Sequence, residues 1–300
     1  MPTMSKTKSA TRREITDQIQ VLFWYKWIAM QIGSERPADV RVAVEPHKSG
    51  LNKDGAPDKN GKYLAYSKGV RTPNTALIEQ AERQIPGSSG AFNHPIWIAL
   101  GKGGSIAPYA RMLVNGLAGN VRDLMFTRRN ELRVDLSDVY LRLLVKIGTL
   151  DSLAALTILF RLNLARRNSA DIWACSTAIF QVLVLLIPLF KPLGLANLLY
   201  YAYARKLFYS ATHDGYTREW EKYPFEEAAT HFWRIATSVV PEEASSERLL
   251  KQEVLKAIEK VPSGHTFNLM PLYVPDCRLG PPTEAGALIL RQISEIAEGG

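Results

Sequence analysis

Apolar residues recur every three or four positions along most of the chain, which is the spacing of one face of an α-helix. The first such segment covers residues 11–32, and Gly33 followed by Pro37 marks its end. Shorter segments of the same kind cover residues 62–68 and 74–85. The pattern therefore predicts three helices in the first third of the chain.

The helical pattern is clearest between residues 108 and 261. The longer helices expected there cover residues 136–150, 153–164, 172–187, 193–208, 225–239 and 246–261. A polar Gly/Pro/Lys loop at 46–61 and a proline-rich stretch at 262–282 should interrupt the helices, and 283–297 should be helical again. We predict a mainly α protein in which an N-terminal helical region precedes a larger multi-helix bundle or stacked helical hairpins.

The glycine-rich segment 101–105 predicts a boundary between domains. It divides the chain into a basic N-terminal region (1–105), a helical bundle (106–261) and a proline-rich segment with a C-terminal helix (262–300). Lys102 among these glycines could also hold a phosphate at a helix N-terminus. The segment lacks the Gly-Lys-Ser/Thr ending of a P-loop and no strand clearly precedes it, so a linker is the preferred interpretation.

Charge is unevenly distributed along the chain. The 300 residues carry a net charge of +8. Residues 1–170 hold 25 Lys and Arg against 14 Asp and Glu, whereas residues 211–300 hold 9 against 14. Either the N-terminal half meets a polyanion or the two halves attract each other, and solvated surfaces alone can also give such a distribution.

One basic segment resembles part of a known DNA-binding family. Residues 62–73 read Lys-Tyr-Leu-Ala-Tyr-Ser-Lys-Gly-Val-Arg-Thr-Pro, and the helix predicted at 74–85 follows. This arrangement resembles the recognition-helix region (residues 62–85) of Cro/repressor-type helix-turn-helix domains. The resemblance implies a short helix in a DNA groove, with phosphate contacts from Lys53, Lys59 and Arg71. It implies the following DNA-binding residues: Lys62, Tyr63, Tyr66, Ser67, Lys68 and Arg71.

The family's positioning helix has no counterpart directly before this segment. The polar loop 46–61 occupies that place, so the helix at 11–32 would have to serve from a greater distance. A plain helical packing role for residues 62–85 is the alternative interpretation.

A second signal is hydropathy. Residues 172–190 contain no charged side chain, and their length is close to the roughly 20 residues that span a bilayer. Arg166 and Arg167 precede the segment and Lys191 follows it, so charge gives no clear orientation. A central helix that is apolar on all sides is the preferred interpretation, and membrane association through 172–208 is the alternative.

Other candidate chemistry is sparse. The two cysteines, Cys175 and Cys277, form neither a disulfide framework nor a zinc pattern, and Cys175 should be a buried apolar side chain. The five histidines form no metal motif. An acid/base cluster is conceivable among His213, Asp214, Tyr216, Glu219 and His231, but surface or packing roles are the preferred interpretation. We predict no catalytic residues, no metal and no cofactor. The aromatic run at 23–27 favours core packing over base stacking.

Together these patterns favour a DNA-binding regulatory protein of bacterial type, without enzymatic activity, that acts on double-stranded DNA in the cytoplasm. Residues 1–13 are polar and basic and lack the apolar core of a signal peptide, so a cytoplasmic setting is expected. The alternatives are a helical interaction or scaffold module that binds a protein partner or a second copy of itself, or a membrane-associated protein.

Overall fold

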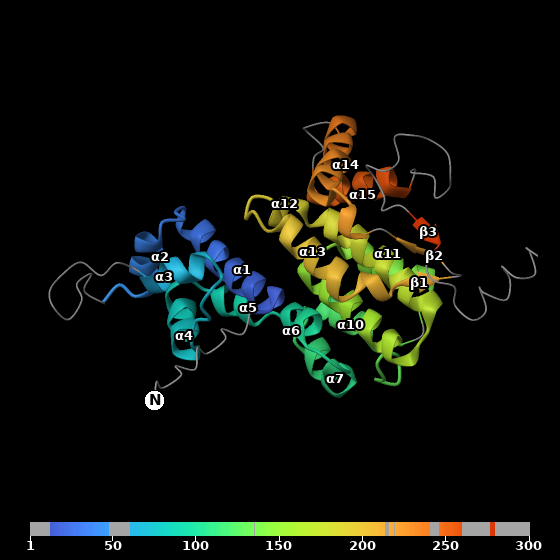
Figure 1. The fold of residues 1–300 in the computed structure, drawn as a ribbon, viewed down its shortest axis with the longest axis horizontal. Helices are drawn as coiled ribbons and strands as arrows, with labels where there is room; N and C mark the ends of the chain where they lie inside the picture. The colour runs from blue at the N-terminus through green and yellow to red at the C-terminus, as the bar shows by residue number, and fades with distance from the viewer. Residues whose placement is uncertain are drawn as a thin grey trace, which may run out of the picture. The chain divides into compact units, whose positions relative to one another are not determined.

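The computed structural model describes residues 13–47, 61–134, 136–213, 216–218, 220–240, 246–259 and 277–279. The chain divides into two compact units, residues 1–93 and residues 94–300 (Figure 1). The described residues are mainly helical and include three short strands. This confirms the predicted fold class.

The first unit is built from short helices around one long one. Its described helices are α1 (Ile15–Ile32), α2 (Pro37–Val44), α3 (Gly61–Ser67), α4 (Thr75–Gln84) and α5 (Ser88–Asn93). The predicted helices at 11–32, 62–68 and 74–85 correspond to α1, α3 and α4. Helix α2 was not predicted, because Pro37 was interpreted only as a stop.

Local capping explains where these helices begin and end. Gly33 adopts a left-handed conformation (φ 72°) that closes α1, and Pro37 then occupies the first turn of α2, where a missing N–H is tolerated. The Asn74 side chain accepts a hydrogen bond from the Leu77 N–H (3.0 Å) at the start of α4. The residue types at these positions therefore fix the helix ends.

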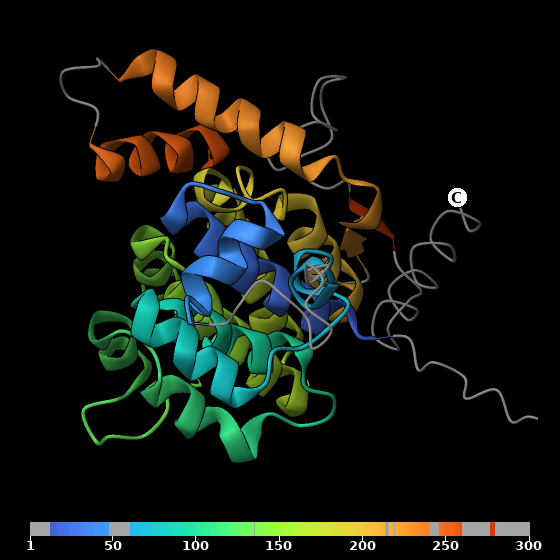
Figure 2. The same ribbon diagram turned by 90° about the vertical axis from the view of Figure 1, so that its left-hand side faces the viewer.

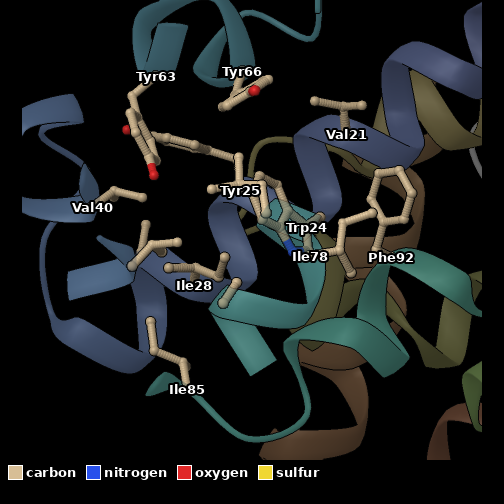
Figure 3. Packing of buried hydrophobic residues seen from close by; sticks show 14 residues of the cluster. Val21, Trp24, Tyr25, Ile28, Val40, Tyr63, Tyr66, Ile78, Ile85 and Phe92 are labelled. Atoms are coloured by element: carbon tan, nitrogen blue, oxygen red, sulfur yellow. The ribbon is translucent and has the colours of Figure 1, made fainter. Parts of the chain in front are cut away.

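The core of the first unit combines aromatic with aliphatic side chains (Figure 3). The Trp24 ring of α1 contacts the Tyr66 ring edge-on (centroids 5.8 Å apart) and the Phe92 ring in the same way (6.1 Å). Tyr63 and Tyr66 are in edge contact at 5.6 Å. Phe23, Trp24 and Tyr25 are buried, so these members of the aromatic run belong to the core and not to a base-stacking surface.

The second unit is larger. Its described α-helices are α6 (Pro95–Gly101), α7 (Ala107–Asn115), α8 (Gly119–Arg122), α9 (Asp138–Ile147), α10 (Leu150–Arg166), α11 (Ser169–Leu185), α12 (Ile187–Phe190), α13 (Ala196–Lys206), α14 (Phe225–Val239) and α15 (Glu247–Glu259). Short 3-10 helices are η1 (Asp123–Met125), η2 (Phe208–Ser210) and η3 (Trp220–Lys222). Helices α14 and α15 run side by side (Figure 2).

Helices α10 and α11 pack against each other and form the centre of this unit. A capping box between Thr149 and Ser152 starts α10, and every residue from 152 to 163 is buried. The Thr157 and Tyr203 hydroxyls share a buried hydrogen bond of 2.7 Å that links α10 to α13. Most of α11 is likewise buried, which confirms the central-helix interpretation. No described helix is both long and apolar enough to cross a bilayer.

Three strands form a small antiparallel sheet in the order β1 (Thr212–His213), β2 (Tyr216–Arg218) and β3 (Cys277–Leu279). His213 pairs with Tyr216 across the hairpin, and Tyr216 pairs with Leu279 on the other side. This sheet was not predicted, because the strands are too short to show an alternating apolar pattern.

The two compact units of the structure meet at residues 93 and 94, before the predicted boundary at residue 105. Arg161 of α10 is buried, and its guanidinium donates to the Ala99 carbonyl (2.8 Å) and to the Gly104 carbonyl (2.5 Å). Lys206 Nζ donates to the Gly101 carbonyl (3.3 Å). The carbonyls of Ala99 and Gly101 belong to the last turn of α6, which leaves them without helical partners. The glycine-rich segment is therefore a fixed part of the second unit and not a linker.

Several predictions fall on residues outside those described. They concern residues 48–60 of the predicted loop, the proline-rich stretch 262–282 except β3, and the predicted C-terminal helix at 283–297. They stay predictions, as does the separate region 262–300.

Candidate nucleic-acid interface

The structure corrects the role predicted for two residues of α3. Tyr63 and Tyr66 are 1% and 2% exposed, respectively, so they cannot reach a DNA groove. Their spacing of three places both on the helix face that packs against α1. Burial raises the pKa of both phenols, so their hydroxyls stay protonated donors at neutral pH.

A buried carboxylate explains the polar groups of this helix. The Tyr63 hydroxyl donates to Glu45 Oε2 (2.7 Å), and Lys62 Nζ forms an ion pair with the same oxygen (2.8 Å). The Glu45 side chain is 4% exposed, so its charge needs such partners. Lys62 therefore has an internal role, which makes it a poor phosphate ligand.

The turn after α3 packs against α1. Gly69 has φ 68°, and a Cβ there would lie 3.0 Å from both the Gln18 carbonyl oxygen and Leu22 Cγ, so glycine is required. The Arg13 guanidinium donates to the Gly69 carbonyl (3.0 Å) and to Thr72 Oγ1 (2.5 Å). The glycine of the predicted motif thus serves a tight helix connection.

Three of the six predicted residues remain at or near the surface. Lys68 and Arg71 are exposed, and neither makes an ion pair with a described residue. Ser67 is half-buried and its hydroxyl donates to the Leu64 carbonyl of its own helix (2.9 Å). Lys53 and Lys59 lie outside the described residues. The structure thus leaves two cations for phosphate contact on this face.

A second basic surface lies in the second unit, around the turn at residues 127–131. The Thr127 N–H donates to the Glu131 carbonyl (2.8 Å), and Thr127 Oγ1 accepts from the Arg129 and Glu131 N–H groups (3.2 and 3.3 Å). Asn130 adopts the left-handed conformation (φ 59°) that asparagine tolerates. This turn presents Arg128 and Arg129 to solvent at its tip.

Both ends of the turn border a cleft of about 430 Å³. Its lining consists of Arg111, Asn115, Arg122, Asp123, Phe126 and Asn130. The Arg111 guanidinium lies 5.5 Å from the centre of the Phe126 ring, in cation–π range. Arg122 forms an exposed ion pair with Asp123 (3.2 Å). Helices α7 and α8, η1 and the turn together supply these groups.

Most of the positive charge on this surface has no carboxylate partner among the described residues. Residues 94–134 hold six Lys and Arg against two Asp and Glu. Arg111, Arg128 and Arg129 are exposed and form no ion pair with any described residue. Arg133 differs, because its Nε donates to the Phe126 carbonyl (3.1 Å) and its guanidinium covers the Tyr140 ring. We define Arg111, Arg122, Arg128 and Arg129 as the arginine surface.

A carboxylate in the second unit positions one of these arginines. Asp151 at the start of α10 accepts from the Ala118 N–H (3.1 Å), directly before α8, and α8 carries Arg122. His94 Nε2 lies 3.5 Å from the same carboxylate oxygen. Burial alone would raise the pKa of Asp151, but the His94 and Ala118 hydrogen bonds together outweigh it and lower the pKa. Asp151 therefore stays ionised and holds the start of α8 in place.

One local signal for this surface is present in the sequence. Arg128, Arg129 and Asn130 are consecutive, and Asn in the third position favours a tight turn. The contributions of Arg111 and Arg122 depend on how α7 and α8 fold back, which no local pattern shows.

Other candidate chemistry finds no support among the described residues. No three described His, Cys, Asp or Glu side chains are grouped so that they could hold a metal ion. Cys175 is buried, and burial raises the pKa of its thiol, so it is unsuited to nucleophilic chemistry. The predicted cluster around His213 involves side chains outside the described set.

Comparison with known proteins gives no relative, since no family model, no curated protein and no solved structure matches the chain.

Proposed function

We propose that the protein binds double-stranded DNA through phosphate contacts made by the arginine surface. The observation that carries the proposal is that Arg111, Arg128 and Arg129 are exposed and lack a carboxylate partner among the described residues. The cleft beside them is lined by Asn115 and Asn130 as well as by Arg111. A guanidinium binds phosphate oxygens through two parallel hydrogen bonds, and side-chain amides commonly add further phosphate contacts.

The groups of the arginine surface favour binding to DNA phosphates over recognition of the base sequence. Phosphate contacts fix a protein on the duplex but carry no sequence information directly. The residues predicted to read bases include Tyr63 and Tyr66, which are buried. We therefore propose similar affinity for unrelated duplex sequences, and a regulatory role would require base contacts from another part of the chain.

Fluorescence anisotropy with a labelled random-sequence duplex tests this proposal. Binding should weaken steeply as salt rises, because each neutralised phosphate contributes about −0.9 to the slope of log K against log[salt]. In the variant Arg128→Gln/Arg129→Gln the slope should become shallower by roughly one to two. Salt-independent binding, or no binding at low salt, would contradict the proposal.

A matched control removes two exposed arginines elsewhere in the second unit. Arg205 lies on α13 and Arg234 on α14, both outside the arginine surface. Arg205→Gln/Arg234→Gln lowers the net charge equally, so it isolates the contribution of position from that of total charge. If the slope of log K against log[salt] became as shallow in this variant as in Arg128→Gln/Arg129→Gln, general charge and not the arginine surface would account for binding.

A further inference from the structure

A separate groove of about 800 Å³ lies in the second unit between α9, α11 and α15. Its lining residues recur at helical spacing on each of the three helices, for example 138, 142 and 145 on α9 or 174, 178 and 181 on α11. One stripe of each helix therefore faces the same space. The volume falls in the range of sites for small organic ligands, about 300–1,000 Å³.

The walls of the groove combine positive charge with apolar surface. Arg142 and Lys146 are one turn apart on α9, and neither forms an ion pair with a described residue. Asp138 also lines the groove, at the start of the same helix, without pairing with either cation. Val145 and Leu255 supply buried apolar surface beside them. An anion with an apolar body would satisfy both kinds of surface.

A side-chain amide adds a hydrogen-bonding group on the wall formed by α11. Gln181 of α11 is half-buried, and its amide makes no hydrogen bond with a described residue. It offers both a donor and an acceptor to a bound ligand. Lys256 lines the groove too, but it already pairs with Glu253 (2.6 Å).

The third wall is fixed in place. Lys251 of α15 donates from Nζ to the Gly148 carbonyl (3.1 Å) at the left-handed end of α9. The same ammonium pairs with Glu247 one turn earlier on α15 (2.7 Å). The groove thus has preformed walls, which lowers the entropy lost when a ligand binds.

We propose that this groove binds a small amphipathic organic anion, with a carboxylate or sulfonate group on Arg142 and Lys146 and a hydrocarbon or aromatic body against Val145 and Leu255. This site is independent of DNA binding and is not needed for the proposed function. The head group would accept charge-assisted hydrogen bonds, and the body would remove apolar surface from water.

The test uses 8-anilinonaphthalene-1-sulfonate, an aromatic sulfonate whose fluorescence rises in apolar sites, added to the full-length protein. We expect saturable binding to the wild type and roughly tenfold weaker binding to Arg142→Gln/Lys146→Gln. Both residues are exposed helix positions, so circular dichroism should show an unchanged fold. Arg205→Gln/Arg234→Gln serves as the control of equal charge and should bind like the wild type.

Displacement then tests the two parts of the ligand. Decanoate should displace the dye from the wild type at a lower concentration than decanol, because only decanoate carries the anionic head group. Unchanged dye binding by Arg142→Gln/Lys146→Gln, equal losses in the control variant, or equal displacement by decanoate and decanol would each overturn the proposal. Anisotropy with duplex DNA, measured on the same variants, separates failure of this site from failure of DNA binding.

Discussion

Helix α3 in the first unit and the turn at 127–131 in the second both carry basic side chains, but these side chains have different partners. In α3, Lys62 and Tyr63 bind the buried Glu45, and Tyr66 packs against Trp24. In the turn, a threonine side chain satisfies the backbone, while Arg128 and Arg129 point to solvent without described partners. Partners, and not residue types, therefore separate a structural segment from a binding surface.

The physical reason lies in what each group does before a ligand arrives. A cation that already neutralises a buried carboxylate would leave that carboxylate uncompensated if it moved to a phosphate. An exposed, unpaired guanidinium gives up only water and counterions. Lys62 and Arg128 therefore differ in their availability although both are basic residues in helical or turn segments.

Tyr66→Ala should have the largest effect on stability and tests directly whether α3 is a structural segment. If Tyr66 is a core residue, its removal loses the contacts with Trp24 and Tyr63 and should lower the free energy of unfolding by about 3–5 kcal/mol. Leu64→Ala on the same helix is the control, since Leu64 is 43% exposed. Urea unfolding measures both variants, and a change below about 0.5 kcal/mol for Tyr66→Ala would restore the surface interpretation.

Tyr63→Phe should have the next largest effect. It removes one hydrogen-bond donor from the buried Glu45 carboxylate and leaves the ring in place. We expect a loss of about 1–3 kcal/mol in unfolding free energy, with unchanged salt dependence of DNA binding. Tyr209→Phe provides the control, because Tyr209 is 68% exposed. A variant with full stability but weaker DNA binding would show that this hydroxyl contacts the ligand.

Asp151 links stability to pH on the side of the arginine surface. Its pKa is lowered in the folded protein, so its contribution is present above the unfolded-state pKa of about 4 and is lost as pH falls through the folded pKa. Asp151→Asn should lower the unfolding free energy by about 1 kcal/mol at pH 7. The difference from wild type should shrink in acid, and a difference that does not change with pH would contradict this role of Asp151.

Much of the fold was predictable because helical periodicity and caps are local. The predicted helix at 225–239 matches α14, and Asn74 and Gly33 mark helix ends as expected. The sequence does not show that the glycine-rich segment 101–105 belongs to the second unit. Its place there depends on Arg161, more than fifty residues later, which binds the carbonyls of Ala99 and Gly104.

The site was less predictable for a similar reason. The pattern at residues 62–73 predicts the helix and the turn correctly, but it assigns the buried side chain of Tyr63 to the DNA-binding surface. Nothing in the pattern shows that Tyr63 binds the buried Glu45. Arg128 and Arg129 were visible as a pair, whereas their neighbours Arg111 and Arg122 join them only through the packing of α7 and α8. Local sequence predicts elements, and long-range contacts decide which side chains remain available.

The last prediction concerns Lys68 and Arg71, the two cations near α3 that stay exposed without a described ion pair. Lys68→Gln/Arg71→Gln should change the unfolding free energy by no more than about 0.5 kcal/mol, because neither side chain supports the core. If the helix-turn-helix resemblance also reflects function, the salt slope of duplex binding should become shallower by about 0.9 for each lost phosphate contact. A slope equal to the wild type, alongside a shallower slope for Arg128→Gln/Arg129→Gln, would assign DNA contact to the second unit and leave residues 62–73 a purely structural connection.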